Sequence, residues 1–119
     1  MHQFWRVIQL KKDILRNNYD FTAIYKKGKS IGDRYIVLFY KKNNLGYRRT
    51  AFLASKKVGN SVRRNRARRL MKENYRKLAD RLADGYDIIF IARNTINDKK
   101  SYEVGSSMKN AIRRAKLYK

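Results

Sequence analysis

The sequence has no cysteine, no proline and a single histidine among 119 residues. Without cysteine the chain forms neither disulfides nor thiolate zinc sites. The histidine, His2, has no partner set for acid–base catalysis, and the acidic residues are not clustered as metal-dependent hydrolysis requires. Asp80 and Asp84 stand at i, i+4, which is more typical of a solvated helix end. We therefore assign no catalytic residue and no metal ligand to the protein.

Long apolar runs are also missing. The early run 4–10 is short and is interrupted by Arg6 and Gln9, so it is neither a membrane span nor the core of a signal sequence. There is no internal repeat and no Gly/Ser-rich linker. We expect residues 1–119 to form one cytoplasmic domain without membrane association, in which residues 1–13 are a flexible N-terminal segment.

Acidic residues are few, with 9 Asp and Glu against 31 Lys and Arg, for a formal net charge of +22. Such an excess repels itself in a compact state and exceeds what solubility requires. Basic residues extend from Arg6 to Lys119, so the charge belongs to a folded surface. The expected partner is a polyanion. Nucleic acid is favoured over an anionic membrane, since neutralising phosphates releases condensed counterions.

The first half of the chain predicts one helix and two strands. Residues 17–28 have an asparagine cap candidate, helical spacing of apolar residues and a terminal Gly28. Residues 34–40 and 47–55 are rich in β-branched and aromatic residues and flank an Asn-Asn-Leu-Gly turn. They predict two antiparallel strands.

The second half predicts two helices around one strand. Ser61 is the expected cap of a long amphipathic helix, and Ser101 that of a last one. The apolar run 86–92 predicts a central strand buried on both faces, parallel and adjacent to the strand that precedes the long helix. The order is helix, two or three strands, helix, strand, helix, an α+β sandwich. The expected core positions of the two helices are Ala67, Leu70, Met71, Leu78 and Leu82, then Val104, Met108, Ala111, Ile112 and Ala115.

Positive charge is densest on the long helix. Between Lys56 and Arg76 there are nine basic residues and one acid, a net +8 in 21 residues. Solvated helix faces usually mix Glu with Lys, whereas repeated arginines repel one another at a cost. Arginine also binds phosphate bidentately, so a phosphate-binding face is the favoured interpretation. Its residues fall within one arc opposite the apolar stripe: Asn65, Arg68, Arg69, Lys72 and Arg76.

The segment 55–61 places a glycine and small polar residues before this helix. Free backbone amides and the helix dipole favour an anion at such a position. A turn of this kind is weak evidence alone, and its value comes from the adjacent arginines.

The stretch SKKVGNSVRRNRARRL, residues 55–70, resembles the signature of the protein subunit of bacterial ribonuclease P. The resemblance extends through segments 18–21, 25–30, 86–93 and 113–118. It implies a two-layer α+β sandwich with the order helix, three strands, helix, strand, helix. It also implies a left-handed βαβ crossover, as in domain 2 of ribosomal protein S5. Physical rules alone favour a right-handed crossover.

The resemblance further implies a subunit that binds a catalytic ribonuclease P RNA and assists removal of the 5′ leader from precursor tRNA. The RNA would carry the chemistry and hold most of the Mg2+, with one protein per RNA and no obligate homo-oligomer. Contacts with the catalytic RNA are implied for Arg64, Asn65, Arg66, Arg68, Arg69 and Lys72, to which the charge pattern adds Lys56, Lys57 and Arg76. A leader cleft is implied for Phe21, Tyr25, Val37 and Phe39.

From the residues alone, Phe21 and Tyr25 at i, i+4 are more typical of core than of a base platform. Phe39 stands where relatives can have tyrosine, which removes a hydroxyl contact. Two other functions stay open, a structural RNA-binding protein of ribosomal type and a DNA-binding protein that inserts its arginine helix in a major groove. A helix so uniformly basic suits phosphates better than base edges, which disfavours the DNA alternative.

Overall fold

The computed structural model describes residues 14–15 and 18–119, so the expected flexible segment 1–13 lies outside the described residues. Within them the predicted order of elements is confirmed. Two short 3-10 turns, Ala79–Arg81 and Asn94–Ile96, follow the long helix and the last strand. The main elements are α2 (Asn18–Lys27), β1 (Lys29–Gly32), β2 (Ile36–Lys42), β3 (Arg49–Leu53), α3 (Ser61–Leu78), β4 (Tyr86–Ala92) and α4 (Ser101–Arg114).

The four strands form one sheet in the order β1-β2-β4-β3. β4 is antiparallel to β2 and parallel to β3, which confirms the parallel neighbours joined by the long helix. β2 and β3 run in opposite directions, as expected, but they do not pair with each other because β4 lies between them. A strand with buried residues on both faces belongs in the centre of a sheet, and a simple hairpin of β2 and β3 would exclude it.

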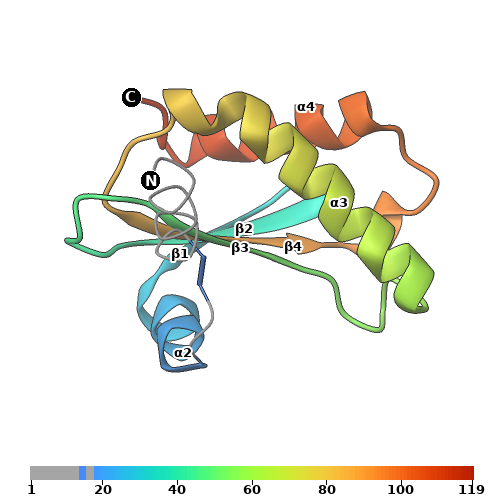
Figure 1. Ribbon diagram of the computed structural model, residues 1–119, viewed down its shortest axis with the longest axis horizontal. Helices are drawn as coiled ribbons and strands as arrows, with labels where there is room; N and C mark the ends of the chain where they lie inside the picture. The colour runs from blue at the N-terminus through green and yellow to red at the C-terminus, as the bar shows by residue number, and fades with distance from the viewer. Residues whose placement is uncertain (1–13, 16–17) are drawn as a thin grey trace, which may run out of the picture.

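The helices lie on both faces of this sheet (Figure 1). α3 and α4 cover one face, and α2 lies on the other. Because side chains alternate along a strand, β4 contributes Ile88 and Phe90 to the larger core under α3 and α4. It contributes Ile89 to a smaller cluster that includes Ile24 of α2. The expected core positions of the long helix and of α4 are all buried.

Both predicted helix caps were off by one residue. Asn60, not Ser61, caps α3, and its side chain accepts a hydrogen bond from the Arg63 amide at 3.1 Å. Asparagine is as good a cap as serine, and here it directly follows the Gly59 turn. α4 begins at Ser101 after Lys100, and Ser101 instead accepts a hydrogen bond from Asn74 of α3. The serine thus joins the two helices.

Gly28 allows α2 to turn directly into β1. A Cβ at this position would lie 2.5 Å from the carbonyl oxygen of Ile24 and 2.7 Å from that of Tyr40. Real Cβ atoms do not approach backbone so closely, so the corner needs glycine. The end of α2 is thereby held against β2. In the part of the chain that the structure describes, no helix is long and apolar enough to cross a membrane.

Candidate nucleic-acid interface

The outward face of α3 is basic along its length. Arg68 is half-buried, while Arg69, Lys72 and Arg76 are exposed. The structure thus brings together the residues that the helical spacing placed in one arc, and they line one shallow surface hollow. Its lining is Asn65, Arg68, Arg69, Lys72, Glu73 and Arg76.

The charges on this face are poorly compensated within the described residues. Glu73 is the one acid that lines the hollow. No arginine of the hollow forms an ion pair with a described carboxylate. Arg68 donates a hydrogen bond to Asn65, which holds its guanidinium on the outer surface. The face therefore presents several unneutralised cations with donors free to meet phosphate oxygens.

Arg64 and Arg66 lie on the flanks of α3 and not in the hollow. Arg66 is half-buried and donates to the carbonyl oxygen of Lys99 at 2.6 Å, which ties α3 to the segment before α4. Arg64 donates to the Ser61 hydroxyl at 3.3 Å, while its Nε is buried without a described partner. Part of the predicted RNA-binding set therefore also has structural contacts.

The turn before α3 places two further predicted lysines at the surface. Lys56 and Lys57 are exposed, and the buried Val58 anchors the turn between them and the helix. Asn97 donates to the Val58 carbonyl oxygen at 2.7 Å and fixes the turn from below. The Asn60 side chain accepts a hydrogen bond from the Arg63 amide and caps the helix. Two lysines thus stand beside the positive end of the α3 dipole, where an anion is stabilised.

On the opposite side of the sheet, the four predicted leader residues form an aromatic surface, which we define as Phe21, Tyr25, Val37 and Phe39. The Tyr25 and Phe39 rings meet edge to face, with centroids 5.0 Å apart. Phe21 and Phe39 are half-buried against the smaller core cluster. Tyr25 is 43% exposed, and partial burial raises the pKa of its hydroxyl, which stays a hydrogen-bond donor. The aromatic surface is part core and part accessible.

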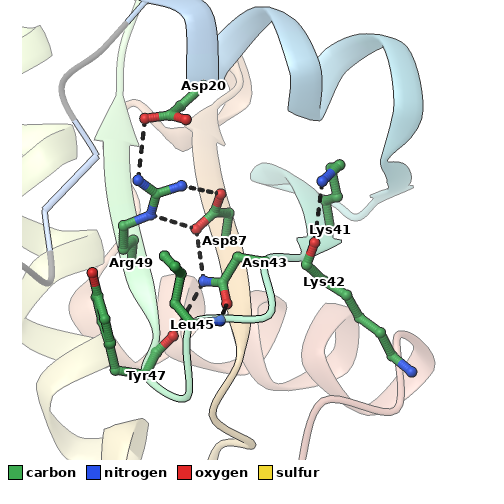
Figure 2. A network of polar contacts seen from close by, with 8 residues as sticks. All are labelled: Asp20, Lys41, Lys42, Asn43, Leu45, Tyr47, Arg49 and Asp87. Carbon is green, nitrogen blue, oxygen red and sulfur yellow. Dashed lines mark hydrogen bonds and ion pairs between the residues drawn. The ribbon is translucent and has the colours of Figure 1, made fainter.

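A polar network joins α2 to the sheet (Figure 2). Arg49 of β3 donates to both oxygens of the buried Asp87 of β4, at 2.8 and 2.7 Å. It also donates to Asp20 in the first turn of α2 at 3.1 Å. Asn43 donates to Asp87 at 2.9 Å and to the Tyr47 carbonyl oxygen at 3.1 Å. The hydrogen bonds that Arg49 donates to Asp87 raise the pKa of Arg49, so its charge is permanent.

Sequence reasoning did not identify this network, because its members are spread from residue 20 to residue 87. The one visible signal is Asp87 itself, an acid inside the apolar run 86–92, which must be paired if it is buried. Arg49 is therefore used for structure, and it fixes the end of α2 that precedes the aromatic surface.

Arg48 is likewise used within the fold. Its guanidinium donates to the Tyr75 hydroxyl and to the carbonyl oxygens of Ala79 and Leu82, each at 2.8 Å. These carbonyls lie in and just after the 3-10 turn that follows α3, where a cation near a helix C-terminus is favoured. Its ion pair with Asp84, at 3.3 Å, explains one member of the acidic pair noted in the sequence.

This is a small α+β fold in which one helix has an arginine-rich face whose charge is not neutralised by acidic side chains. Such a face is typical of proteins that bind nucleic acid through its phosphates. Comparison with known proteins then identifies the family. The sequence model of the family described as Ribonuclease P matches residues 10–116. The chain belongs to the ribonuclease P protein family.

Individual relatives agree with this assignment over nearly the whole chain. A ribonuclease P protein component of Clostridium botulinum is 42% identical over 110 residues, which cover 92% of this chain and 99% of the relative. One of Thermoanaerobacter is 38% identical over 113 residues, 95% of this chain and 93% of the relative.

Solved structures show the same fold. The RNase P protein of Staphylococcus aureus superposes with a TM-score of 0.82 at 31% identity, covering 90% of this chain and 98% of its own. The protein of Thermotoga maritima superposes with a TM-score of 0.77 at 30% identity, covering 84% and 94%. The hand of the β3–α3–β4 crossover stays a prediction from the family.

Arg49→Ala is expected to lower the free energy of unfolding by about 3 to 5 kcal/mol, because Asp87 would be left buried without its counter-charge. Urea unfolding followed by circular dichroism at fixed ionic strength measures this. The control is Asp84→Asn, whose carboxylate side chain is 58% exposed and whose loss should cost no more than about 1 kcal/mol. Equal, small losses for both variants would contradict the structural role of Arg49.

Proposed function

We propose that this chain is the protein component of a ribonuclease P ribonucleoprotein in the cytoplasm. It binds the catalytic RNA through the basic face of α3 and the 5′ leader of precursor tRNA through the aromatic surface. It thereby assists the endonucleolytic cut that gives the mature tRNA 5′ end. The RNA subunit carries the chemistry and holds most of the Mg2+, and one protein acts per RNA.

The observation that carries this proposal is the basic face of α3. Arginine forks donate bidentately to phosphate oxygens and carry no sequence information by doing so. A folded RNA offers many phosphates at fixed positions, and a rigid helix holds the Cβ atoms of i, i+3 and i, i+4 neighbours about 5–6 Å apart, which fixes the bases of its cationic side chains. Lys56 and Lys57 extend the same face beyond the start of α3.

The aromatic surface suits the leader for a different reason. An unpaired base stacks on an aromatic ring with about 1–3 kcal/mol, and the interaction tolerates any base. Leaders differ among precursors, so contacts of this kind serve all of them. The sheet lies between α3 and α2, the helix that contributes Phe21 and Tyr25 to the aromatic surface (Figure 1). In the proposed complex the two RNAs would therefore lie on opposite sides of the protein.

The use of acidic side chains in the fold supports chemistry by the RNA. Asp20 and Asp87 are taken up by Arg49, and Asp84 pairs with Arg48. Asp33 accepts a hydrogen bond from Ser107 and pairs with Arg114 at 3.7 Å. A two-metal nuclease needs carboxylates directed together at its metals, whereas these are directed at arginines.

Reconstitution tests the proposal directly. The chain is mixed with a ribonuclease P RNA and a precursor tRNA at low Mg2+, where cleavage by RNA alone is weak because the RNA phosphates are poorly neutralised. We expect the protein to restore leader removal, measured as release of the labelled leader. A protein that binds the RNA without stimulating cleavage would favour the ribosomal-type alternative.

The double substitution Arg68→Ala with Arg69→Ala is expected to weaken binding of the ribonuclease P RNA and to flatten its dependence on salt. Each lost phosphate contact reduces the log–log slope by about 0.7 to 0.9, so the two together should reduce it by about 1.5. Filter binding over a salt series measures the slope. Lys109→Ala with Arg113→Ala removes the same charge from exposed positions on α4, and an equal change of slope there would remove α3 from the interface.

Phe21→Ala is expected to weaken binding of precursor tRNA to the reconstituted enzyme more than binding of mature tRNA. Only the precursor has leader bases that can stack on the Phe21 ring. The dissociation constant for mature tRNA divided by that for precursor tRNA should fall by about tenfold, equivalent to about 1.4 kcal/mol. Phe52→Ala truncates a half-buried phenylalanine on the α3 side of the sheet and should leave the ratio unchanged. Equal losses for both tRNAs would make Phe21 purely structural.

A further inference from the structure

A second group of cations lies at the other end of the aromatic surface, away from α3. It comes from the last turn of α2 and the end of β2. We name it the lysine edge. Its members are Lys26, Lys27 and Lys41.

The Gly28 corner brings the end of α2 close to the end of β2. α2 passes into β1 without a loop because Gly28 lies against the carbonyl oxygen of Tyr40. Lys29 is then paired in register with Tyr40, and Lys41 follows at once on β2. Residues distant in the sequence thus form one edge of the sheet.

Lys41 has a carboxylate opposite it that it does not use. Lys41 of β2 pairs in register with Asp87 of β4, and opposite charges at such positions normally attract. The oxygens of Asp87 are instead bound by Arg49 and Asn43. The Lys41 ammonium donates to the carbonyl oxygen of Lys42 at 3.1 Å, at the end of the strand (Figure 2). The fold has satisfied Asp87 elsewhere and left this cation available.

The same holds for the rest of the lysine edge. Among the described residues, the ion pairs are all made by arginines, and none of these lysines pairs with a carboxylate. Lys26 and Lys27 are exposed, and Lys41 is half-buried. Neighbouring like charges without compensation raise the free energy of the folded protein. An anionic partner would remove that cost.

The position of the lysine edge indicates which anion. Phe39 and Lys41 are two residues apart on one strand, so their side chains leave the same face of the sheet. Tyr25 is followed directly by Lys26. A strand of RNA whose bases stack on the aromatic surface therefore reaches the lysine edge with its backbone. α3 lies on the other face of the sheet (Figure 1).

We propose that the lysine edge binds the phosphate backbone of the 5′ leader beyond the nucleotides that stack on the aromatic surface. This inference rests on the proposed function. Flexible lysine stems that end in point charges suit a mobile single strand, because they neutralise phosphates without fixing base or backbone geometry. The lysine edge would give long leaders an affinity that short leaders lack, independently of their sequence.

The test compares a short-leader with a long-leader precursor on the reconstituted enzyme, for the wild type and for the combined Lys26→Gln, Lys27→Gln and Lys41→Gln variant. The wild type should bind the long leader more tightly, and the variant should lose that gain. For the long leader, the log–log salt slope should fall by about 2, at about 0.7 for each single-strand phosphate contact. Lysine-to-arginine changes at the same three positions should keep both the tighter binding of the long leader and the wild-type salt slope.

The control combines Lys77→Gln, Lys109→Gln and Lys116→Gln, three exposed lysines on α3 and on or just after α4. It removes the same charge and should keep the gain from a long leader. The proposal is overturned if the lysine-edge variant keeps that gain, or if the control loses it equally, which would indicate a general effect of charge. Failure of the wild-type protein to stimulate leader removal would instead contradict the proposed function.

Discussion

The arrangement of this protein depends on the burial of β4 on both of its faces. Ile88, Ile89 and Phe90 are fully buried, and their side chains alternate between the two sides of the sheet. One side needs α3 and α4 as cover, and the other needs α2. A strand in this position separates two surfaces by the thickness of the sheet, so the basic face of α3 and the aromatic surface look in opposite directions. The apolar core thereby sets the relative directions of the two surfaces that we propose to bind RNA.

The second constraint is a net charge of +22 that has to be accommodated by few acids. Asp87, Asp20, Asp84 and Asp33 pair with arginines at joints of the fold, between α2 and the sheet, after α3 and beside α4. These four aspartates neutralise arginines where two elements meet, and the outer faces keep a positive charge. The fold is thus stabilised locally while its surface repels itself, and phosphates bound to that surface add stability by binding the folded state.

Arginines of this chain consequently have two kinds of role that their sequence context does not distinguish. Arg68 and Arg69 lie on the outer surface of α3, whereas Arg66, two residues earlier, donates to the backbone of the segment before α4. Arg48 and Arg49 are adjacent in the chain, yet one completes the end of α3 and the other binds Asp87 and Asp20. A guanidinium has donors enough for backbone carbonyls or carboxylates, and only the neighbouring elements determine which it meets.

The sequence by itself determined the three helices, the central strand 86–92 and the arc on α3, because periodicity and charge density are local properties, but it gave no bounds for the short strand β1. It left open whether Phe21 and Tyr25 are core residues or a surface on which bases stack, since spacing along a helix does not fix how much of a ring is buried. Tertiary structure decided that β4 separates β2 from β3 and that Phe21 is half-buried while Tyr25 is more exposed. It also decided that Asp87 binds Arg49 and not Lys41. These outcomes depend on contacts between segments far apart in the chain. Such contacts form only when the buried strand β4 pairs with β2 and β3 and is covered by helices on both faces.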